Sequence, residues 1–280
     1  MKTVNSLSGG KTSSYIAAHY PADYDVFALV RIEDDSCRIK DKKIVQEIED
    51  RIQAPFIATA EDDAIIYTML DLEQYIGRPI IWVTGPTFES TIHDVAGGYL
   101  PNRIRRFCTS EMKTKPIASW RHNTINDDVI MRFGFRANEK SRANTMNSKL
   151  NENGQTEVKI VIGKLKDGRN KWKTIEYCAP EYPLIEDNIY KDNIEHYWSD
   201  KPVRFAYMNN CIGCWWRTPA LLKHMHTKFP KKMEYFSNLE KNGKGTFKKD
   251  MSYEKIISWK PQIKLFDDSF GECDSGYCGL

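Results

Sequence analysis

The chain has 280 residues, 41% of them hydrophobic, and a formal net charge of +3 at pH 7. This length and apolar content are enough for a sizeable buried core. The small net charge does not by itself indicate any class of binding partner. No apolar run approaches a membrane span, and no targeting segment follows Met1, so we expect a cytoplasmic protein without membrane contact. Seven cysteines in such a chain favour a metal, a cluster or redox chemistry over structural disulfides.

The first residues contain the most informative pattern. Residues 3–7 alternate and predict a strand, residues 14–19 predict a helix, and a glycine turn of sequence SGGKTS separates them. Unpaired N–H groups and the helix dipole can hold a phosphate at such a junction, and the glycines let the backbone approach it. The spacing is neither that of a Walker loop nor that of a dinucleotide fingerprint. The predicted phosphate-binding residues are Ser8, Gly9, Gly10, Lys11, Thr12 and Ser13.

The following residues alternate between short apolar runs and segments of helical period. Strands that alternate with helices predict an α/β fold with a doubly wound, mostly parallel sheet. Further strands are predicted at residues 26–30, 54–58, 79–83 and 129–131, and helices at 40–52 and 61–76.

Two regions are predicted from this pattern. Residues 1–200 are predicted to form a nucleotide-binding α/β domain. Two strand-like runs joined by a turn at 167–170 predict a hairpin inserted in this domain at about residues 155–178. Beyond it the composition shifts toward cysteine, lysine and aromatic residues. We therefore expect residues 201–280 to form a small, cysteine-rich C-terminal appendage.

Four ordered segments resemble the phosphoadenosine phosphosulfate reductase family of the PP-loop ATP pyrophosphatase superfamily. The turn SGGKTS is similar to the SGGxDS loop, although Thr12 stands in place of Asp. Residues 106–116 are similar to C-T-x-x-x-K-x-x-P, and residues 134–142 to G-x-R-x-x-E-S-x-R with Lys140 inserted. Residues 183–197 are similar to P-[IL]-x…D-[IV]-x-x-Y. The resemblance covers about residues 1–220 and implies an adenine nucleotide alpha hydrolase-like fold.

The same resemblance implies roles for several basic residues. Lys11, Lys113 and Arg136 are candidate catalytic residues that bind phosphate or neutralise a leaving group, and Gly134, Arg136 and Arg142 extend the nucleotide site. Gly134 follows a predicted strand, so both arginines are expected at the sheet edge where open α/β sheets bind ligands. A planar guanidinium suits a pair of phosphate or sulfate oxygens. The alternative is that Arg136 only pairs with Glu139 at the surface.

Cysteines give two competing ligand sets. Cys211 and Cys214 form a C-x-x-C knuckle, and Cys273 and Cys278 lie near the end of the chain. These four thiolates would suit a structural zinc ion. Iron–sulfur members of the family that the chain resembles carry a cysteine in the C-T-x-x-x-K segment and a later C-x-x-C. The resemblance therefore favours a 4Fe-4S cluster held by Cys108, Cys211, Cys214 and one tail cysteine, with zinc as the alternative.

The resemblance implies an adenine-nucleotide-dependent enzyme of sulfur chemistry. Its substrate is ATP or a sulfonucleotide, with Mg²⁺. Assimilatory reductases of the family use a cysteine near the C-terminus as the nucleophile, so Cys278 is a candidate catalytic residue, although Tyr277 replaces the usual Glu. One alternative is an ATP-pyrophosphatase-type sulfurtransferase that acts on DNA or tRNA. Another is a catalytically inactive nucleotide sensor or partner-binding protein, which the replacement at Thr12 would suit.

A basic stretch at residues 221–250 suggests a nucleic-acid acceptor, because lysines there alternate with aromatic residues. The alternative is a charged helix face over a small apolar core. The acidic clusters at 33–35 and 61–63 are expected to be solvated. The stretch has eight lysines, which are Lys223, Lys228, Lys231, Lys232, Lys241, Lys244, Lys248 and Lys249.

Overall fold

The structure is a computed structural model that describes residues 1–260. The chain folds into two compact units, each assembled from separate segments, whereas the sequence suggested a division near residue 200. Unit 1 contains Met1–Ala28, Ala64–Val83 and Thr114–Ala206, and unit 2 contains Leu29–Asp63, Thr84–Lys113 and residues 207–260. Within residues 1–260, no helix is both long and apolar enough to cross a membrane.

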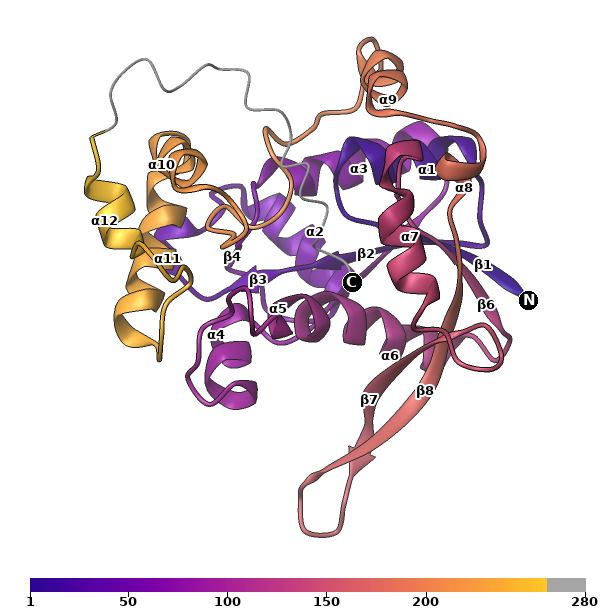
Figure 1. Cartoon of the computed structure of the whole chain (residues 1–280), viewed down its shortest axis with the longest axis horizontal. Coiled ribbons are helices and arrows are strands. Elements are labelled where there is room, and N and C mark those ends of the chain that lie inside the picture. The colour runs from indigo at the N-terminus through magenta and orange to yellow at the C-terminus, as the bar shows by residue number, and fades with distance from the viewer. Residues whose placement is uncertain (261–280) are drawn as a thin grey trace. The chain divides into compact units, whose positions relative to one another are not determined.

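A six-stranded, mostly parallel sheet forms the centre of unit 1 (Figure 1). Its strands are β1 (Lys2–Leu7), β2 (Tyr24–Leu29), β5 (Ile80–Thr84), β6 (Val129–Arg132), β7 (Thr156–Lys164) and β8 (Asn170–Glu181). Their order in the sheet is β5-β2-β1-β6-β8-β7. β1 is parallel to β2 and to β6, and β6 is parallel to β8, whereas β7 and β8 form the predicted hairpin.

Both faces of this sheet are buried along its parallel strands β1 and β2. Val4, Val26 and Val129 pack with Ile117 on one face, and the alternate positions, such as the buried Phe27, face the other side. A parallel sheet needs helices on both faces for this reason, so the predicted α/β class is confirmed. The helices of unit 1 are α1 (Lys11–His19), α3 (Ala64–Ile76), α6 (Lys115–Thr124), α7 (Lys140–Asn147), α8 (Pro183–Glu186) and α9 (Lys191–Trp198).

The strand order reverses at β1. The chain passes from β1 through α1 to β2 on one side, and later returns to the other side of β1 with β6. In open α/β sheets, ligands bind at such a switch point, outside the carboxyl ends of the strands. The segments that follow β1 and β6 therefore border the expected ligand crevice, and both belong to unit 1.

Unit 2 has little sheet, and its core is made largely by helices and loops. Its two short strands, β3 (Arg31–Ile32) and β4 (Ala58–Thr59), are antiparallel. Residues from 207 onward supply much of the core, including Met208, Leu222 and Phe236. Its helices are α2 (Lys42–Ile52), α4 (Phe88–Ser90), α5 (Phe107–Thr109), α10 (Pro219–Lys228), α11 (Pro230–Asn242) and α12 (Tyr253–Ser258).

The prediction of a strand at residues 54–58 is wrong for most of its length. Only Ala58–Thr59 is a strand, and it pairs with Arg31–Ile32 instead of joining the six-stranded sheet. Pro55 lacks a backbone N–H and cannot donate to a ladder within a central strand. Apolar composition alone did not reveal this restriction.

Candidate functional site

The predicted phosphate loop lies at the switch point, between β1 and α1. Gly10 is the N-cap of α1 with extended backbone angles, and no side chain of residues 1–260 caps this helix end. The first N–H groups of α1 are thus available to an anion. Ser13 Oγ accepts from the Ser8 N–H and donates to Gly10 O, each at 3.1 Å, which holds the turn closed.

Gly9 meets two separate demands for a residue without a side chain. Its φ is +78°, in the left-handed region that glycine tolerates best. A Cβ added there would also lie 2.4 Å from Cγ2 of Ile65 in α3. The loop therefore passes so close to α3 that only glycine fits.

Gly134 connects the loop with the segment that follows β6. A Cβ at Gly134 would lie 3.2 Å from Cγ2 of Thr12 and 3.7 Å from the Ser13 nitrogen. Two of the segments that carry the family resemblance, far apart in sequence, thus meet at the first turn of α1. The side chain of Thr12 contributes a methyl group to this contact, at the position where the resembling pattern has a carboxylate.

Lys11 is held by residues from α9 and from the segment after it. Its Nζ forms an ion pair with Glu195 and lies 5.9 Å from the centre of the Phe205 ring, while Trp198 Nε1 donates to its backbone oxygen at 3.0 Å. Both charged side chains are partly exposed. A partly exposed ion pair of this kind contributes about 0–1 kcal/mol, because solvent screens it. Glu195 therefore holds the Lys11 side chain only weakly.

Arg136 and Arg142 share one carboxylate. Arg136 Nε donates to Glu139 Oε2 at 3.0 Å, and Arg142 donates to Glu139 Oε1 at 2.7 Å. The sequence offered a surface pair between Arg136 and Glu139 as an alternative, but both residues are buried, with exposed fractions of 8% and 9%. The two arginines and Glu139 together have a net charge of +1. This charge lies close in sequence to Gly134, which contacts the first turn of α1.

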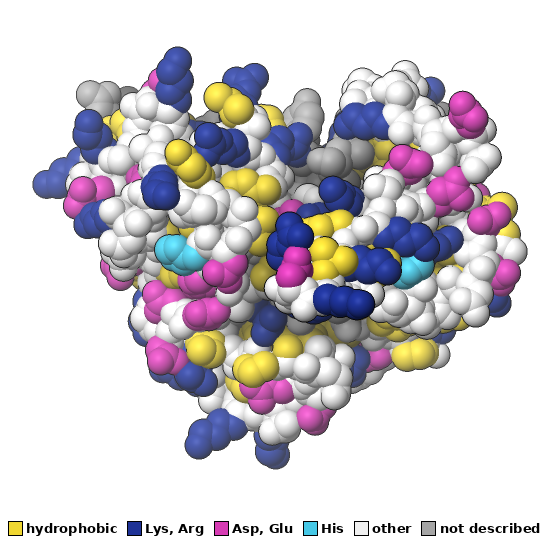
Figure 2. All heavy atoms as spheres, turned by 90° about the horizontal axis from the view of Figure 1, so that it is seen from below, with side chains coloured by type: hydrophobic (Ala, Val, Ile, Leu, Met, Phe, Trp, Pro, Cys, Tyr) yellow, Lys and Arg dark blue, Asp and Glu magenta, His cyan; other side chains and the backbone are white. Residues whose placement is uncertain are grey.

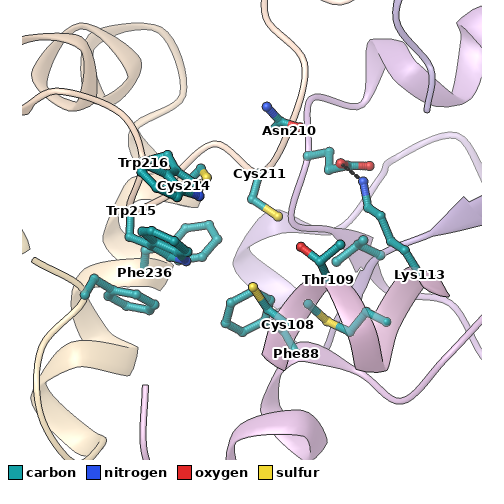
Figure 3. A pocket seen from close by; sticks show the side chains of 15 residues that line it. Phe88, Cys108, Thr109, Lys113, Asn210, Cys211, Cys214, Trp215, Trp216 and Phe236 are labelled. Atoms are coloured by element: carbon teal, nitrogen blue, oxygen red, sulfur yellow. Dashed lines mark hydrogen bonds and ion pairs between the residues drawn. The ribbon is translucent and has the colours of Figure 1, made fainter. Parts of the chain in front are cut away.

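Unit 2 brings three cysteines to one cavity of about 40 Å³, which also has apolar and aromatic walls. In Figure 3, Cys108 and Cys211 point toward the central space from different segments, and Cys214 lies beside Trp216. A single water needs about 10–15 Å³ by this measure, so the space admits an ion or small inorganic group. Three of the predicted ligands, Cys108, Cys211 and Cys214, therefore line one cavity, and a metal or cluster bound by them stays a prediction.

A buried carboxylate also lines this cavity. Glu61 is 0% exposed and accepts from Lys113 Nζ at 2.7 Å, while its Oε2 has no hydrogen-bond partner among residues 1–260. The expectation that residues 61–63 are solvated is therefore wrong for Glu61. Lys113, a predicted catalytic residue, lines the cysteine cavity in unit 2, whereas Lys11 and Arg136 belong to unit 1.

Two cationic side chains, Arg217 and Lys248, bind the backbone of the loop that carries the C-x-x-C knuckle, Cys211 and Cys214. Arg217 is 1% exposed, and its guanidinium donates to the carbonyl oxygens of Asn209 (2.6 Å) and Cys211 (3.3 Å). Lys248 Nζ donates to the carbonyl oxygens of Trp215 and Arg217, and burial lowers its pKa. Both cations are thus bound to backbone carbonyl oxygens of residues 209–217, which fixes the segment that contains Cys211 and Cys214.

The remaining cysteines differ from these three. Cys178 is fully buried in unit 1, and burial raises its pKa to about 12, so it is inert as a nucleophile. The predicted ligands Cys273 and Cys278 lie outside the described residues. Within residues 1–260, no group of three or more Cys, His, Asp or Glu side chains is placed to hold a metal ion.

The basic stretch 221–250 contributes mainly to the interior of unit 2. Tyr235, Phe236 and Phe247 are buried, and Lys232 is a buried side chain that donates to Asp63 at 2.7 Å. Lys223, Lys244 and Lys248 donate to backbone carbonyl oxygens, and Lys241 pairs with Glu254. These contacts agree with a helical face over an apolar core. A nucleic-acid surface on this stretch stays a prediction.

Two charged residues of these sites were not recognised from sequence. Glu195 lies 184 positions from Lys11, and Glu61 lies 52 positions from Lys113. Glu195 falls in the segment 183–197, at a position that the family pattern leaves unspecified. The sequence gives one signal for the burial of Glu61. A short apolar run precedes it, and the end of that run is the buried strand β4.

Comparison with protein-family profiles, with curated proteins and with solved structures finds no match to this chain.

Glu139 gives a testable dependence of stability on pH. Burial works to raise the pKa of Glu139, but hydrogen bonds from the Arg136 N–H and from Arg142, with both guanidinium charges, outweigh it and keep the pKa below 4.5. A carboxyl group with a lowered folded-state pKa stabilises the fold above its unfolded value and loses this contribution as the pH falls through its folded value.

We therefore expect Glu139→Gln to lower the free energy of unfolding at pH 7 by about 1.5–3 kcal/mol. The difference from the parent protein should shrink as the pH falls below 4.5. Urea unfolding at several pH values measures both effects, with Glu152→Gln on an exposed turn as the control. A difference that does not change with pH would contradict this role of Glu139.

Proposed function

We propose that this protein is a PP-loop, adenine-nucleotide-dependent enzyme of sulfur chemistry, similar to phosphoadenosine phosphosulfate reductases, with the adenine nucleotide alpha hydrolase-like fold. It binds ATP or a sulfonucleotide at the loop Ser8–Ser13. The contact between Gly134 and the first turn of α1 is the main observation that supports this proposal. It brings together two of the sequence segments that resemble the family, at the switch point of the sheet.

The loop and the neighbouring basic residues have distinct tasks in this proposal. The N–H groups at the start of α1 and Lys11 bind phosphate oxygens, after Glu195 has released Lys11. Arg136 and Arg142, aligned by Glu139, offer guanidinium donors to an anionic leaving group. Because Thr12 supplies no carboxylate, Mg²⁺ would be held mainly by the phosphates of the nucleotide.

The reaction depends on which nucleotide is bound. With ATP, an acceptor oxygen attacks the α-phosphorus and pyrophosphate leaves. With a sulfonucleotide, a thiolate attacks the sulfur, the nucleoside phosphate leaves, and a thiol reductant must then release sulfite from the cysteine. Cys278 is the proposed thiolate for the second reaction. The first reaction would serve the alternative function, sulfur transfer to DNA or tRNA.

The three cysteines of unit 2 suit a metal centre. Cys108, Cys211 and Cys214 line one cavity with the unpartnered Glu61 Oε2, and a tail cysteine would complete four ligands. Such thiolate sets hold zinc or a 4Fe-4S cluster. A bound cluster would supply a polarising charge, and zinc would supply folding free energy. Lys113, aligned by Glu61, is the basic side chain that lines the same cavity.

A nucleotide sensor without catalytic activity is the second candidate, and one observation favours it. The Thr12 methyl packs toward Gly134 at the position where a catalytic loop of this family has Asp. Incubation with ATP and Mg²⁺, or with adenylyl sulfate and a thiol, separates the two functions. The enzyme releases AMP with pyrophosphate or with sulfite, whereas the sensor only binds the nucleotide.

Lys11→Ala tests the nucleotide site. Loss of one charge-assisted phosphate contact should weaken ATP binding by about 1.5–3 kcal/mol, roughly tenfold to a hundredfold. Glu195→Gln should keep or improve the affinity, because it removes the competing carboxylate. Isothermal titration calorimetry measures both, with Lys149→Ala on the surface as the control. Equal affinities of Lys11→Ala and the parent, with the fold intact, would exclude the loop as the phosphate site.

Metal content tests the cysteine site. If a 4Fe-4S cluster is bound, anaerobically purified protein should be brown and contain iron and sulfide, and Cys108→Ser should lose both. If zinc is bound by the knuckle and the tail, the protein should be colourless and Cys108→Ser should keep its metal. Cys178→Ser, far from the cavity in sequence and buried in unit 1, should keep the metal in either case. Protein that is active without metal would refute both ligand sets.

A further inference from the structure

The end of the β7–β8 hairpin extends beyond the sheet of unit 1 (Figure 1). β8 pairs with β6 only at residues 179–181, so the distal part of the hairpin is a two-stranded ribbon. Every residue from Val161 to Thr174 is exposed. The buried Ile160 and Ile175 mark the place where the ribbon leaves the core. No function proposed above uses this ribbon.

The ribbon carries a strong positive charge. Between Val161 and Thr174 its one acidic residue, Asp167, lies at the turn and pairs with Arg169 at 2.6 Å, and Glu157 and Glu176 lie opposite each other at the base of the ribbon. None of the ribbon lysines is paired with a carboxylate among residues 1–260. Figure 2, which views the chain from below, shows Lys and Arg side chains gathered around exposed hydrophobic ones where the hairpin points toward the viewer. The basic residues are Lys159, Lys164, Lys166, Arg169, Lys171 and Lys173.

The lysines lie on both faces of the ribbon. Lys159 is opposite Thr174 and Val161 is opposite Trp172, so these four side chains share one face. Ile160 is opposite Lys173, and Gly163 is opposite Lys171, which puts both of these lysines on the other face. Cations on both faces suit a ligand that presents phosphates on either side of the ribbon.

Trp172 is 44% exposed within a group of cations. The Nζ of Lys115 lies 4.9 Å from the centre of its ring, and the Nζ of Lys159 lies 5.9 Å from it. Val161, Ile162 and Leu165 are also about 40% exposed. Lysines on an edge strand often have no role other than to prevent aggregation. That purpose does not explain four large, exposed apolar side chains, nor the lysines of β8.

We propose that this ribbon binds double-stranded DNA by entering its major groove. A B-form major groove is about 12 Å wide and about 8.5 Å deep and admits a two-stranded ribbon. From Ile160 to Leu165 the ribbon extends by about 17 Å at about 3.4 Å per residue, which is enough to reach the base edges. The lysines on both faces then contact the phosphates along the two walls of the groove, and the turn with Leu165 comes nearest to the bases. The interaction does not depend on the proposed enzymatic activity.

Fluorescence anisotropy with a labelled 25-base-pair DNA duplex tests this interaction without added nucleotide. The full chain should bind with a micromolar Kd at physiological salt. This is the tight end of the range of Kd values for non-specific DNA binding, about 10⁻⁴–10⁻⁶ M. The variant Lys164→Gln/Lys171→Gln/Lys173→Gln should bind at least tenfold more weakly. Its slope of log K against log salt concentration should fall by up to about 2.7, at about 0.9 per lost phosphate contact.

A matched control and two other ligands complete the test. Lys43→Gln/Lys149→Gln/Lys255→Gln removes the same charge from exposed sites outside the hairpin and should keep the parent affinity and slope. An RNA duplex should bind more weakly than DNA, because its major groove is too narrow for side chains to enter. Equal loss in both triple variants, equal binding of RNA, or preferential binding of anionic phospholipid vesicles would overturn the proposal.

Discussion

The first turn of α1 is closely packed at two glycines, of which Gly9 admits no side chain. Gly9 has a positive φ and lies against Ile65, and Gly134 lies against Thr12 and the Ser13 nitrogen. A larger residue at Gly9 would push the loop from α3, whereas one at Gly134 would require Thr12 to shift by a few tenths of an ångström. The N–H groups at this helix end are positioned by a loop whose backbone lies close against α3.

The basic residues of unit 1 are held by carboxylates that are not equally easy to displace. Lys11 and Glu195 are partly exposed, so solvent screens their attraction and a phosphate can replace the glutamate. Glu139 is buried and holds both Arg136 and Arg142, so its removal would leave buried charge without compensation. We infer that Lys11 changes partner on ligand binding, whereas Arg136 and Arg142 are oriented in advance.

Much of the fold followed from sequence because its signals are local. The glycine turn between residues 3–7 and 14–19, the alternation of strands and helices, and the hairpin turn near Gly168 all rest on neighbouring residues. The division into two units did not follow, because each unit combines segments that are far apart. The partners Glu195 and Glu61 were missed for the same reason. A charge that pairs across 184 or 52 positions leaves no periodic pattern.

The account depends most on the claim that the start of α1 binds phosphate through its backbone, which amide resonances of labelled protein report directly. Addition of ATP or pyrophosphate should shift the amide signals of Gly10, Lys11 and Ser13, and adenosine alone should leave these signals in place. If ATP binds while these amides do not shift, or if adenosine shifts them as strongly as ATP, the nucleotide site lies elsewhere and the account is wrong.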